Sequence, residues 1–349
     1  MEVGRRILVP IPLYHIFGYN EGMLAAMWVG GSIVLCDRKA EGSYILELLR
    51  TSQANDIISV PLIIMRILEA LGDTTANLPD MHAGYWASTC PDWIWDRAKE
   101  AFGITDVTTG YGMTECGSTT TLFSPGCESR DLMRYQGYLK DCGCAGAEME
   151  NHRLLEIQIR DPETGEVLPT GTLGELFCRG LTVTNGYYKN SEANEASFHE
   201  GGWFATGDMG ILEADGKFSF QGRKDFQYKI NGENVSPQRL NTIIGSSRTV
   251  RAVETVGIES ERYGARGVAF VELERDNDKN RKKLEKEMQK SMADFEIPRY
   301  IVVSSGGSWP RTSCGKINPH ALKQLAEQKV RNYEKNCAGA QGKEIKWIS

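Results

Sequence analysis

Hydrophobic positions in the first part of the chain follow two alternating rhythms. Short β-branched runs occupy residues 7–9, 32–35, 57–60 and 107–109. Apolar residues recur with helical spacing in residues 21–29, 44–51, 63–71 and 92–102. Strands that alternate with helices in this way are typical of a parallel sheet covered by helices, so the pattern predicts α/β layers.

The pattern changes after about residue 150. In residues 154–220, apolar strands are separated by turn signals such as Asp215-Gly216, which predicts a mostly antiparallel β-rich part. Beyond residue 222 we expect helices and strands to alternate irregularly, as in a compact α+β unit. The expected helices are 237–244, 280–293 and a last one after Pro319, and the expected strands are 253–258, 267–273 and 300–304.

These patterns predict a large domain followed by a small one. We expect the large domain in residues 1–224, with α/β layers in 1–150 and the β-rich part in 151–224, and the small domain in 225–328. The polar residues 329–349 are predicted to be disordered. Residues 276–290 carry dense charges of both signs, and we interpret them as a solvated helix face with i,i+4 ion pairs rather than as a docking helix.

Composition narrows the classes of function. The chain of 349 residues carries a formal net charge of -6, which provides no broad electropositive field for nucleic acid or an anionic membrane surface. Its 9 scattered cysteines match neither a disulfide scaffold nor a zinc motif, so we expect a reducing, cytoplasmic location. No stretch approaches the roughly 20 apolar residues of a membrane span. Small-molecule chemistry is therefore the default expectation.

The first motif with candidate chemistry is Tyr-Gly-Met-Thr-Glu at residues 111–115, directly after a predicted strand. Ligands bind where the strands of α/β layers end. Tyr111 can offer an aromatic face to a base, Thr114 a hydroxyl to a phosphate and Glu115 a carboxylate to Mg²⁺, while the glycines let the backbone approach a nucleotide. By itself the segment also fits a tight turn with a capping threonine.

A second motif, at residues 202–210, contains Asp208 directly after a glycine. A carboxylate can accept both hydroxyls of a ribose, because its two oxygens match a vicinal diol. An Asx-turn is the alternative interpretation of this segment.

Two further motifs lie near the C-terminal domain. Residues 222–237 place Arg223, Lys224 and Lys229 near the predicted domain junction, and a solvated basic hairpin is the alternative. Residues 310–318 place Lys316 directly after a glycine on a loop, from which a mobile point charge can reach an oxyanion or a phosphate. A plain surface lysine is the alternative there.

In their order and spacing, these motifs resemble those of the adenylate-forming (AMP-binding) superfamily, which includes acyl-CoA synthetases and 4-coumarate-CoA ligases. Residues 12–18, 59–69 and 174–188 also look like family segments, so the resemblance covers residue 7 to about residue 325. It implies an α/β fold with a large adenylation domain and a small, mobile α+β C-terminal domain. It further implies an acid–thiol ligase that uses ATP to convert a carboxylic acid to acyl-AMP and then transfers the acyl group to CoA.

The resemblance assigns roles to individual residues. The resemblance implies that Lys316 acts in the adenylation step. It also implies that Thr114 contacts a phosphate and that Glu115 helps to hold Mg²⁺. Residues with other implied roles are those that bind the nucleotide (Thr109, Gly110, Tyr111, Asp208 and Arg223), the hinge (Asp225), those of the thioester step with CoA (Lys229, Asn231 and Gly232) and those of the acyl pocket (His15, Trp86 and Ser88).

Two departures from the family pattern limit this expectation. The phosphate-binding loop of the family has no counterpart in residues 1–11, so we expect an incomplete adenylation domain that is inactive or impaired by itself. Residues 86–91 replace a Gly-rich segment of the family, which affects the acyl pocket; we expect an aromatic or medium-chain acid. The alternatives are a noncatalytic fragment that binds AMP or CoA or acts as a regulator, and an adenylation enzyme of a peptide-synthetase-like or luciferase-like branch.

Overall fold

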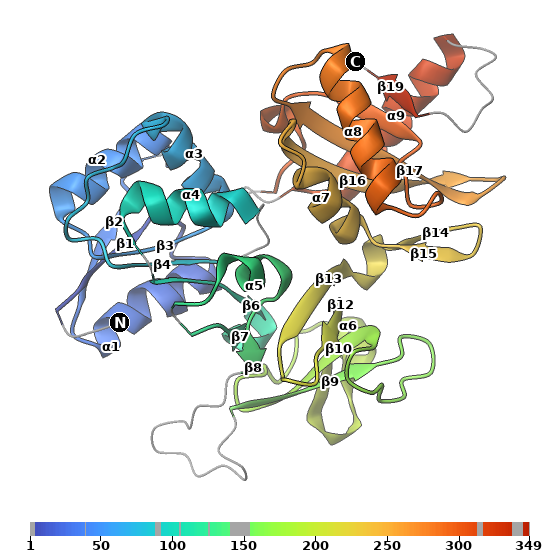
Figure 1. Cartoon of the computed structure of the whole chain (residues 1–349). Coiled ribbons are helices and arrows are strands. Elements are labelled where there is room, and N and C mark those ends of the chain that lie inside the picture. Colours follow the sequence, from blue (N-terminus) through green and yellow to red (C-terminus); the bar gives the residue numbers. More distant parts are fainter. Residues whose placement is uncertain are drawn as a thin grey trace. The chain divides into compact units, whose positions relative to one another are not determined.

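The computed structural model describes residues 4–38, 40–87, 92–104, 106–124, 126–139, 154–312, 317–336 and 345–348. The chain divides into two compact units, Met1–Phe220 and Gln221–Ser349, which we call the first and the second unit (Figure 1). Each buried apolar cluster of the described residues lies entirely within one unit. Each unit therefore has a hydrophobic core of its own.

The first unit contains a parallel sheet in the order β2-β1-β3-β4-β5. Its strands are β1 (Arg6–Val9), β2 (Ser32–Leu35), β3 (Asp56–Ser59), β4 (Ala83–Trp86) and β5 (Asp106–Thr108). The prediction of a parallel α/β arrangement is confirmed. Strand β4 was not predicted, because its sequence Ala-Gly-Tyr-Trp contains no β-branched residue.

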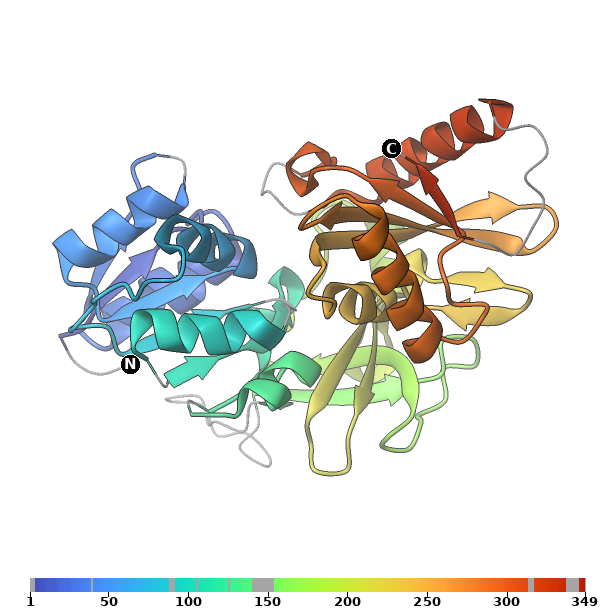
Figure 2. The ribbon, with the colours of Figure 1, turned by 45° about the horizontal axis from the view of Figure 1, so that its top comes forward.

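Helices cover both faces of this sheet, as Figures 1 and 2 show. One face carries the π-helical η1 (Phe17–Leu24) and its continuation α1 (Ala25–Trp28), and the other carries α2 (Gly42–Ser52), α3 (Pro61–Leu71) and α4 (Asp92–Phe102). The predicted helices are confirmed, although the first begins at Phe17 rather than at residue 21. Gly22 lets this helix lie close to β1, because a Cβ there would come within 3.0 Å of the Val9 side chain.

The rest of the first unit is built from antiparallel strands. A three-stranded sheet of β6 (Gly110–Met113), β7 (Ser118–Leu122) and β8 (Tyr138–Leu139) is accompanied by the turn η2 (Thr114–Cys116) and helix α5 (Ser129–Arg134). A second sheet has the order β11-β12-β10-β9, with β13 paired to β12. Its elements are β9 (Leu155–Arg160), β10 (Leu173–Gly180), α6 (Ser191–Ser197), β11 (Phe198–His199), η4 (Glu200–Gly202), β12 (Trp203–Leu212) and β13 (Phe218–Arg223). The predicted β-rich part is thus confirmed.

The second unit opens with the turn η5 (Lys224–Phe226) and a hairpin of β14 (Tyr228–Ile230) and β15 (Glu233–Val235). The two turn residues, Asn231 and Gly232, have φ values of 53° and 89°. Positive φ at both central positions is the signature of a type I′ turn, for which Asn-Gly is a preferred sequence.

A mixed sheet forms the centre of the second unit, in the order β16-β17-β18-β19. Its strands are β16 (Val250–Ser260), β17 (Gly264–Leu273), β18 (Tyr300–Val303) and β19 (Lys346–Ile348), and its helices are α7 (Pro237–Gly245), α8 (Asp278–Ser291), η6 (Gly306–Ser308) and α9 (Pro319–Asn336). Ala269 and Val271 of β17 pack in one core with α7 and α8, whereas Val268 and Phe270 pack in the other core with α9. The period-two alternation of β17 therefore supplies both cores.

The predicted disorder of residues 329–349 is wrong for the part of this segment that the structure describes. Residues 329–336 continue helix α9, in which Val330 is buried. Lys346–Ile348 form β19, which pairs with β18 in parallel and buries Ile348. A few correctly spaced apolar residues are sufficient to dock these elements, even though the segment as a whole is polar.

Candidate functional site

The candidate site is centred on a contact between two motifs that lie far apart in the sequence. The hydroxyl of Tyr111 donates a hydrogen bond to Oδ2 of Asp208 at 2.5 Å, across 97 positions of the chain. Tyr111 is 8% exposed and Asp208 is 5% exposed. The fold therefore brings together two of the residues that the sequence analysis selected, inside the core of the first unit.

Asp208 lies in strand β12 at an irregular point of the sheet. The register between β10 and β12 shifts between Glu175 and Phe177, and Gly207 has a φ of 71°. Such bulges turn a side chain away from the regular alternation of a strand and are common next to active sites. The Asx-turn interpretation of this segment is wrong, because Asp208 is part of a paired strand.

Two buried polar side chains stabilise this bulge. The backbone N–H of Gly207 donates to Oε1 of Glu175 at 3.2 Å, and the N–H of Asp208 donates to Oγ1 of Thr206 at 3.0 Å. The Thr206 hydroxyl in turn donates to the carbonyl of Leu176 at 2.8 Å. Glu175 and Thr206 were not predicted from the sequence to be positioning residues. The Thr-Gly pair before Asp208 was the available signal for a bulge.

Tyr111 is held by an aromatic cluster. Its ring lies 5.0 Å from that of Phe218 and is stacked on Phe220 at 5.8 Å. Burial and the neighbouring Asp208 carboxylate raise the pKa of Tyr111 well above its usual value, so the phenol stays protonated and donates. Its role in this structure is to position Asp208.

The residues next to Tyr111 have packing roles that the sequence analysis did not foresee. A Cβ on Gly112 would lie 1.6 Å from the carbonyl oxygen of Ser118, and one on Gly110 would lie 2.4 Å from that of Thr121. These glycines therefore allow β6 and β7 to pair closely. Thr109, in contrast, is 1% exposed and donates to the Trp86 carbonyl at 3.0 Å.

Thr114 and Glu115 lie on the turn η2 between β6 and β7. Thr114 is exposed and Glu115 is half-buried. Oε1 of Glu115 accepts a hydrogen bond from the Tyr187 hydroxyl at 2.9 Å, and its backbone carbonyl accepts from the N–H of Thr184 at 2.8 Å. One segment distant in sequence, residues 184–187, thus holds the Glu115 backbone and orients its carboxylate.

This arrangement suits a metal that is held largely by its substrate. In the described ranges, no three or more His, Cys, Asp or Glu side chains are grouped closely enough to hold a metal ion. Mg²⁺ is usually held by one or two carboxylates together with phosphate oxygens and water. The single oriented carboxylate of Glu115 fits that role.

The predicted acyl-pocket residues have different surroundings. His15 is half-buried, and its Nδ1 accepts a hydrogen bond from the backbone N–H of Phe17 at 3.2 Å. Trp86 is fully buried and stacked on Trp95 of α4 at 5.2 Å. Its indole lies over Gly84, where a Cβ would come within 2.2 Å of the ring. Because Trp86 offers no surface to a ligand, we do not retain it as a pocket residue.

The remaining predicted residues belong to the second unit or lie outside the described residues. Arg223 ends β13, and Asp225 lies exposed on η5. Lys229 is exposed on β14, next to the turn of Asn231 and Gly232, so the hairpin that was the alternative interpretation of this segment is present. Ser88 and Lys316 lie outside the described residues.

None of the helices in the described ranges combines the length and the apolar character that crossing a bilayer requires.

Comparison with known proteins places this architecture among adenylate-forming enzymes. The family model of the AMP-binding enzymes matches residues 1–188. The chain is 25% identical over 327 residues to a mitochondrial medium-chain acyl-CoA ligase of Danio rerio, covering 93% of this chain and 52% of the relative. It is 28% identical over 274 residues to a 4-coumarate–CoA ligase of Humulus lupulus, covering 76% of this chain and 46% of that protein. The chain thus spans about half the length of these relatives.

Solved structures show the same fold. An anthranilate CoA ligase in complex with anthranoyl-AMP superimposes with a TM-score of 0.80 at 23% identity, covering 95% of this chain and 60% of that one. The predicted fold, α/β layers with a β-rich part and a small α+β unit, is confirmed by this likeness.

Proposed function

Because the chain belongs to the family of AMP-binding enzymes, we propose that it serves the ATP-dependent activation of a carboxylic acid to acyl-AMP, followed by transfer of the acyl group to CoA. The relatives that it resembles over most of its length are CoA ligases. The observation that carries the proposal is the buried contact between Tyr111 and Asp208, which joins two motifs of the family in one site.

Asp208 is proposed to bind the ribose of the nucleotide. Its carboxylate can accept the two hydroxyls of a vicinal diol. The bulge of β12 and the Tyr111 hydroxyl fix its orientation before a ligand binds. Such preorganisation reduces the entropy lost on binding. Arg223 is proposed to contact the same ribose, and the backbone of Gly110 and Tyr111 to lie beside the adenine.

Thr114 and Glu115 are proposed to act at the phosphates. When bound, Mg²⁺ supplies positive charge that stabilises the phosphates during displacement of pyrophosphate. The exposed hydroxyl of Thr114 would contact a phosphate oxygen. The Glu115 carboxylate, oriented by Tyr187, would hold the metal. In the first step the substrate carboxylate attacks the α-phosphorus and pyrophosphate leaves.

The second unit is proposed to serve the two half-reactions with different segments. Lys316 would stabilise the adenylation step, whereas Lys229, Asn231 and Gly232 would serve the attack of the CoA thiol on the acyl-AMP carbonyl, in which AMP leaves. Asp225 would be the hinge between the two poses. The exposure of Lys229 on its hairpin supports a role that depends on movement of the second unit.

The acid is proposed to be aromatic or of medium chain length. The names of the relatives, a medium-chain acyl-CoA ligase and a 4-coumarate–CoA ligase, support this range. His15 is the described residue that we propose to lie beside the acyl group.

Calorimetry with AMP tests the nucleotide site. We expect the chain to bind AMP, and Asp208→Asn to weaken binding at least about tenfold, a loss of about 1.4 kcal/mol. Glu195→Gln, which removes an exposed carboxylate of α6 in the same unit, is the matched control and should leave the affinity unchanged. Absence of AMP binding by the unmodified chain, or equal effects of the two variants, contradicts the proposed site.

Half-reaction assays then separate the possible activities. Carboxylate-dependent pyrophosphate exchange followed by formation of a CoA thioester is the result expected for an acyl-CoA synthetase. AMP binding without exchange would instead indicate a noncatalytic nucleotide-binding protein. Acyl-AMP formation without a CoA thioester would indicate another branch of the adenylate-forming enzymes.

A further inference from the structure

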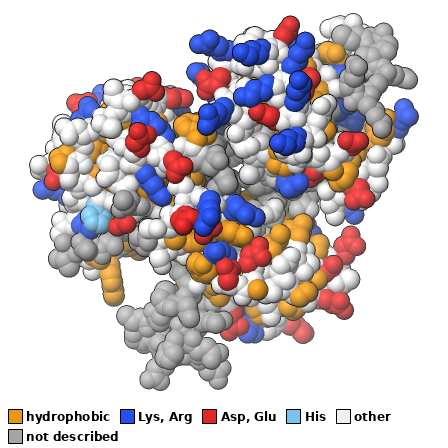
Figure 3. All heavy atoms as spheres, in the orientation of Figure 1, with side chains coloured by type: hydrophobic (Ala, Val, Ile, Leu, Met, Phe, Trp, Pro, Cys, Tyr) orange, Lys and Arg blue, Asp and Glu red, His pale blue; other side chains and the backbone are white. Residues whose placement is uncertain are grey.

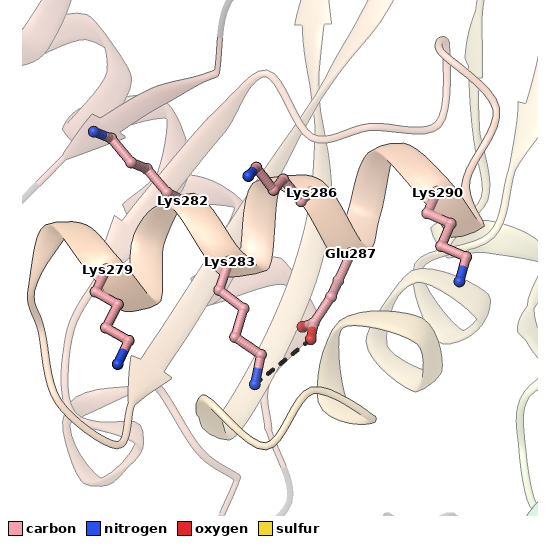
Figure 4. Close-up of a pocket in the computed structure, with 6 residues that line it drawn as sticks. All are labelled: Lys279, Lys282, Lys283, Lys286, Glu287 and Lys290. Atoms are coloured by element: carbon pink, nitrogen blue, oxygen red, sulfur yellow. Dashed lines mark ion pairs between the residues drawn. The ribbon is translucent and has the colours of Figure 1, made fainter.

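Helix α8 carries a row of lysines on its outer face. They are Lys279, Lys282, Lys283, Lys286 and Lys290, which we call the lysine stripe (Figure 4). All of them have exposed side chains. With 100° of rotation per residue, the stripe occupies an arc of about 100° and a length of roughly 16 Å. Leu284 and Met288 lie on the opposite side of the helix, where they are buried.

Of the acidic residues in and beside α8, Glu287 lies next to the stripe, whereas Glu285 and Asp276 have partners outside it. Glu285 accepts a hydrogen bond from the indole of Trp347 at 2.6 Å, and Asp276 forms an ion pair with Arg281. Within the described part of the chain, Lys283 alone among the stripe has an ion pair, with Glu287 at 3.8 Å. The predicted solvated helix face is therefore present, with one of its expected i,i+4 ion pairs among the described residues. Charge is thus unevenly segregated along α8, and its outer face is mainly basic, with Glu287 beside the lysines.

This segregation is unfavourable for the protein by itself. Each lysine of the stripe has another lysine of the stripe three or four positions away, where like charges repel each other on a helix. The chain as a whole has a formal net charge of -6, so the stripe is a local reversal of charge. Figure 3 shows Lys and Arg side chains gathered over the second unit around α8. An anionic partner would relieve the repulsion within the stripe.

We propose that the lysine stripe docks this protein on an anionic lipid bilayer surface. The negative surface of a bilayer with anionic lipids attracts clustered lysines without requiring a shaped pocket. The sequence analysis excluded such a surface on the basis of net charge. The arrangement of charge on α8 reverses that conclusion for one face of the second unit.

The form of the stripe favours lipid over other anionic partners. An open depression of about 480 Å³ is lined by the five lysines and Glu287. Among the described residues its walls all come from one helix, so no second described element shapes it for one small ligand. Protein interfaces are enriched in aromatic residues and depleted in lysine. Nucleic-acid sites commonly add aromatic or arginine side chains that stack on bases. The stripe contains no aromatic residue and no arginine. The partner that it fits best is therefore a planar, negatively charged surface.

Co-sedimentation with lipid vesicles tests this proposal on the full chain. We expect binding to vesicles of phosphatidylcholine with 30% phosphatidylserine, no binding to phosphatidylcholine alone, and loss of binding in high salt. The variant Lys282→Gln, Lys286→Gln, Lys290→Gln removes three charges and keeps the Lys283–Glu287 pair. Because each lysine near an anionic surface contributes about a fivefold factor, we expect this variant to bind on the order of 100-fold more weakly.

A matched control removes three charges elsewhere: Lys189→Gln, Arg331→Gln, Lys335→Gln, all at exposed positions. It should bind vesicles nearly as well as the unmodified chain. Glutamine and lysine have similar helix propensity, so far-ultraviolet circular dichroism should show both variants folded.

The proposal is overturned by equal weakening in both variants, or by absence of binding to anionic vesicles at low salt. Preference for soluble polyglutamate over vesicles of equal charge would also overturn it, in favour of an acidic protein partner. Neither result depends on the proposed enzymatic function, because AMP binding is measured separately.

Discussion

Tyr111 and Asp208 owe their properties to burial as much as to residue type. The sequence analysis assigned the Tyr111 ring to a nucleotide base, but the structure packs this ring against Phe218 and Phe220 and uses its hydroxyl as a donor. In a buried site the phenol is held neutral, because its pKa is raised by desolvation and by the adjacent carboxylate. The hydroxyl is therefore the part of Tyr111 whose removal is most informative.

We predict that Tyr111→Phe destabilises the first unit and weakens AMP binding. The change removes a donor from a buried carboxylate, which costs about 1–3 kcal/mol in comparable cases. Urea unfolding followed by tryptophan fluorescence measures the stability, and calorimetry measures the affinity. Tyr14→Phe is the control, because the Tyr14 side chain is 77% exposed and its loss of a hydroxyl should change neither quantity. Equal stability of the Tyr111 variant and the unmodified chain would contradict the role of the hydroxyl.

Glu254 of β16 is a second residue whose chemistry depends on its surroundings. Burial raises its pKa to about 7, although a hydrogen bond from Asn241 at 2.8 Å and the charge of Arg311 act in the opposite direction. In the unfolded chain this carboxyl has a pKa near its usual value of 4.5. The folded state therefore binds the proton more tightly than the unfolded state does.

This difference predicts that the second unit loses stability as the pH rises. The contribution of Glu254 is fully present below about pH 4.5 and is lost as the pH passes through about 7. Glu254→Gln keeps an acceptor for Asn241 without the charge, so the variant should exceed the unmodified chain in stability at pH 8 by up to about 3 kcal/mol. At pH 4.5 the two should be alike. Thermal unfolding at several pH values measures the effect.

The control for this prediction is Glu259→Gln on the same strand, since the Glu259 side chain is 91% exposed. It should unfold like the unmodified chain at every pH. A constant difference between Glu254→Gln and the unmodified chain from pH 4.5 to pH 8 would refute the assignment of a raised pKa to Glu254.

At the scale of elements, the sequence predicts what depends on local periodicity. The parallel strands other than β4, the helices α2 to α4 and the helices α7 to α9 follow from local sequence patterns. The bulge that aims Asp208 could not be predicted in the same way, because it depends on the register between β10 and β12. The burial of Trp86 likewise depends on Gly84 and on Trp95 of another element. Candidate residues could thus be selected from motifs. Their contacts could not, because these depend on how segments distant in sequence pair and pack.

The junction between the hairpin and the main sheet of the second unit rests on close packing at glycines. Gly257 of β16 faces Gly267 of β17 in register, and the Tyr228 ring lies against both. A Cβ on Gly257 would lie 2.3 Å from Cγ of Tyr228, and one on Gly267 would lie 2.9 Å from the Tyr228 hydroxyl oxygen. A larger residue at either position must displace the half-buried Tyr228 ring.

We predict that Gly257→Ala destabilises the second unit by about 1–3 kcal/mol, the usual cost of overpacking a core. Gly245→Ala is the matched control. Gly245 ends helix α7, and a Cβ there would make an ordinary contact of 3.4 Å with Val253. Alanine in a helix is favoured over glycine by roughly 0.5–1 kcal/mol, so this variant should be as stable as the unmodified chain or more so. Thermal unfolding measures the stability of both variants. An unchanged stability of Gly257→Ala would contradict the prediction, because it would show that the Tyr228 ring moves aside without cost.

At the scale of the whole molecule, the separation of the cores has consequences for unfolding. The clusters around Ile57 and around Leu176 lie within the first unit, and those around Ala269 and Phe270 lie within the second. Units that share no core cluster among the described residues can unfold as separate cooperative transitions. The proposed nucleotide contacts of Tyr111, Glu115 and Asp208 belong to the first unit, whereas the close packing of Gly257 against Tyr228 belongs to the second.

Differential scanning calorimetry of the chain should therefore resolve two transitions that respond to different changes. AMP at 100 times its dissociation constant should stabilise the transition of the first unit by about 2.7 kcal/mol, because a ligand that binds only the folded state shifts its unfolding by mass action. Gly257→Ala should lower only the other transition, since its clash with Tyr228 lies in the second unit. The two effects should add without coupling when both are present. A single transition that moves with either change would show that the units unfold together, and a shift of the second unit alone by AMP would place the nucleotide contacts elsewhere than at Asp208.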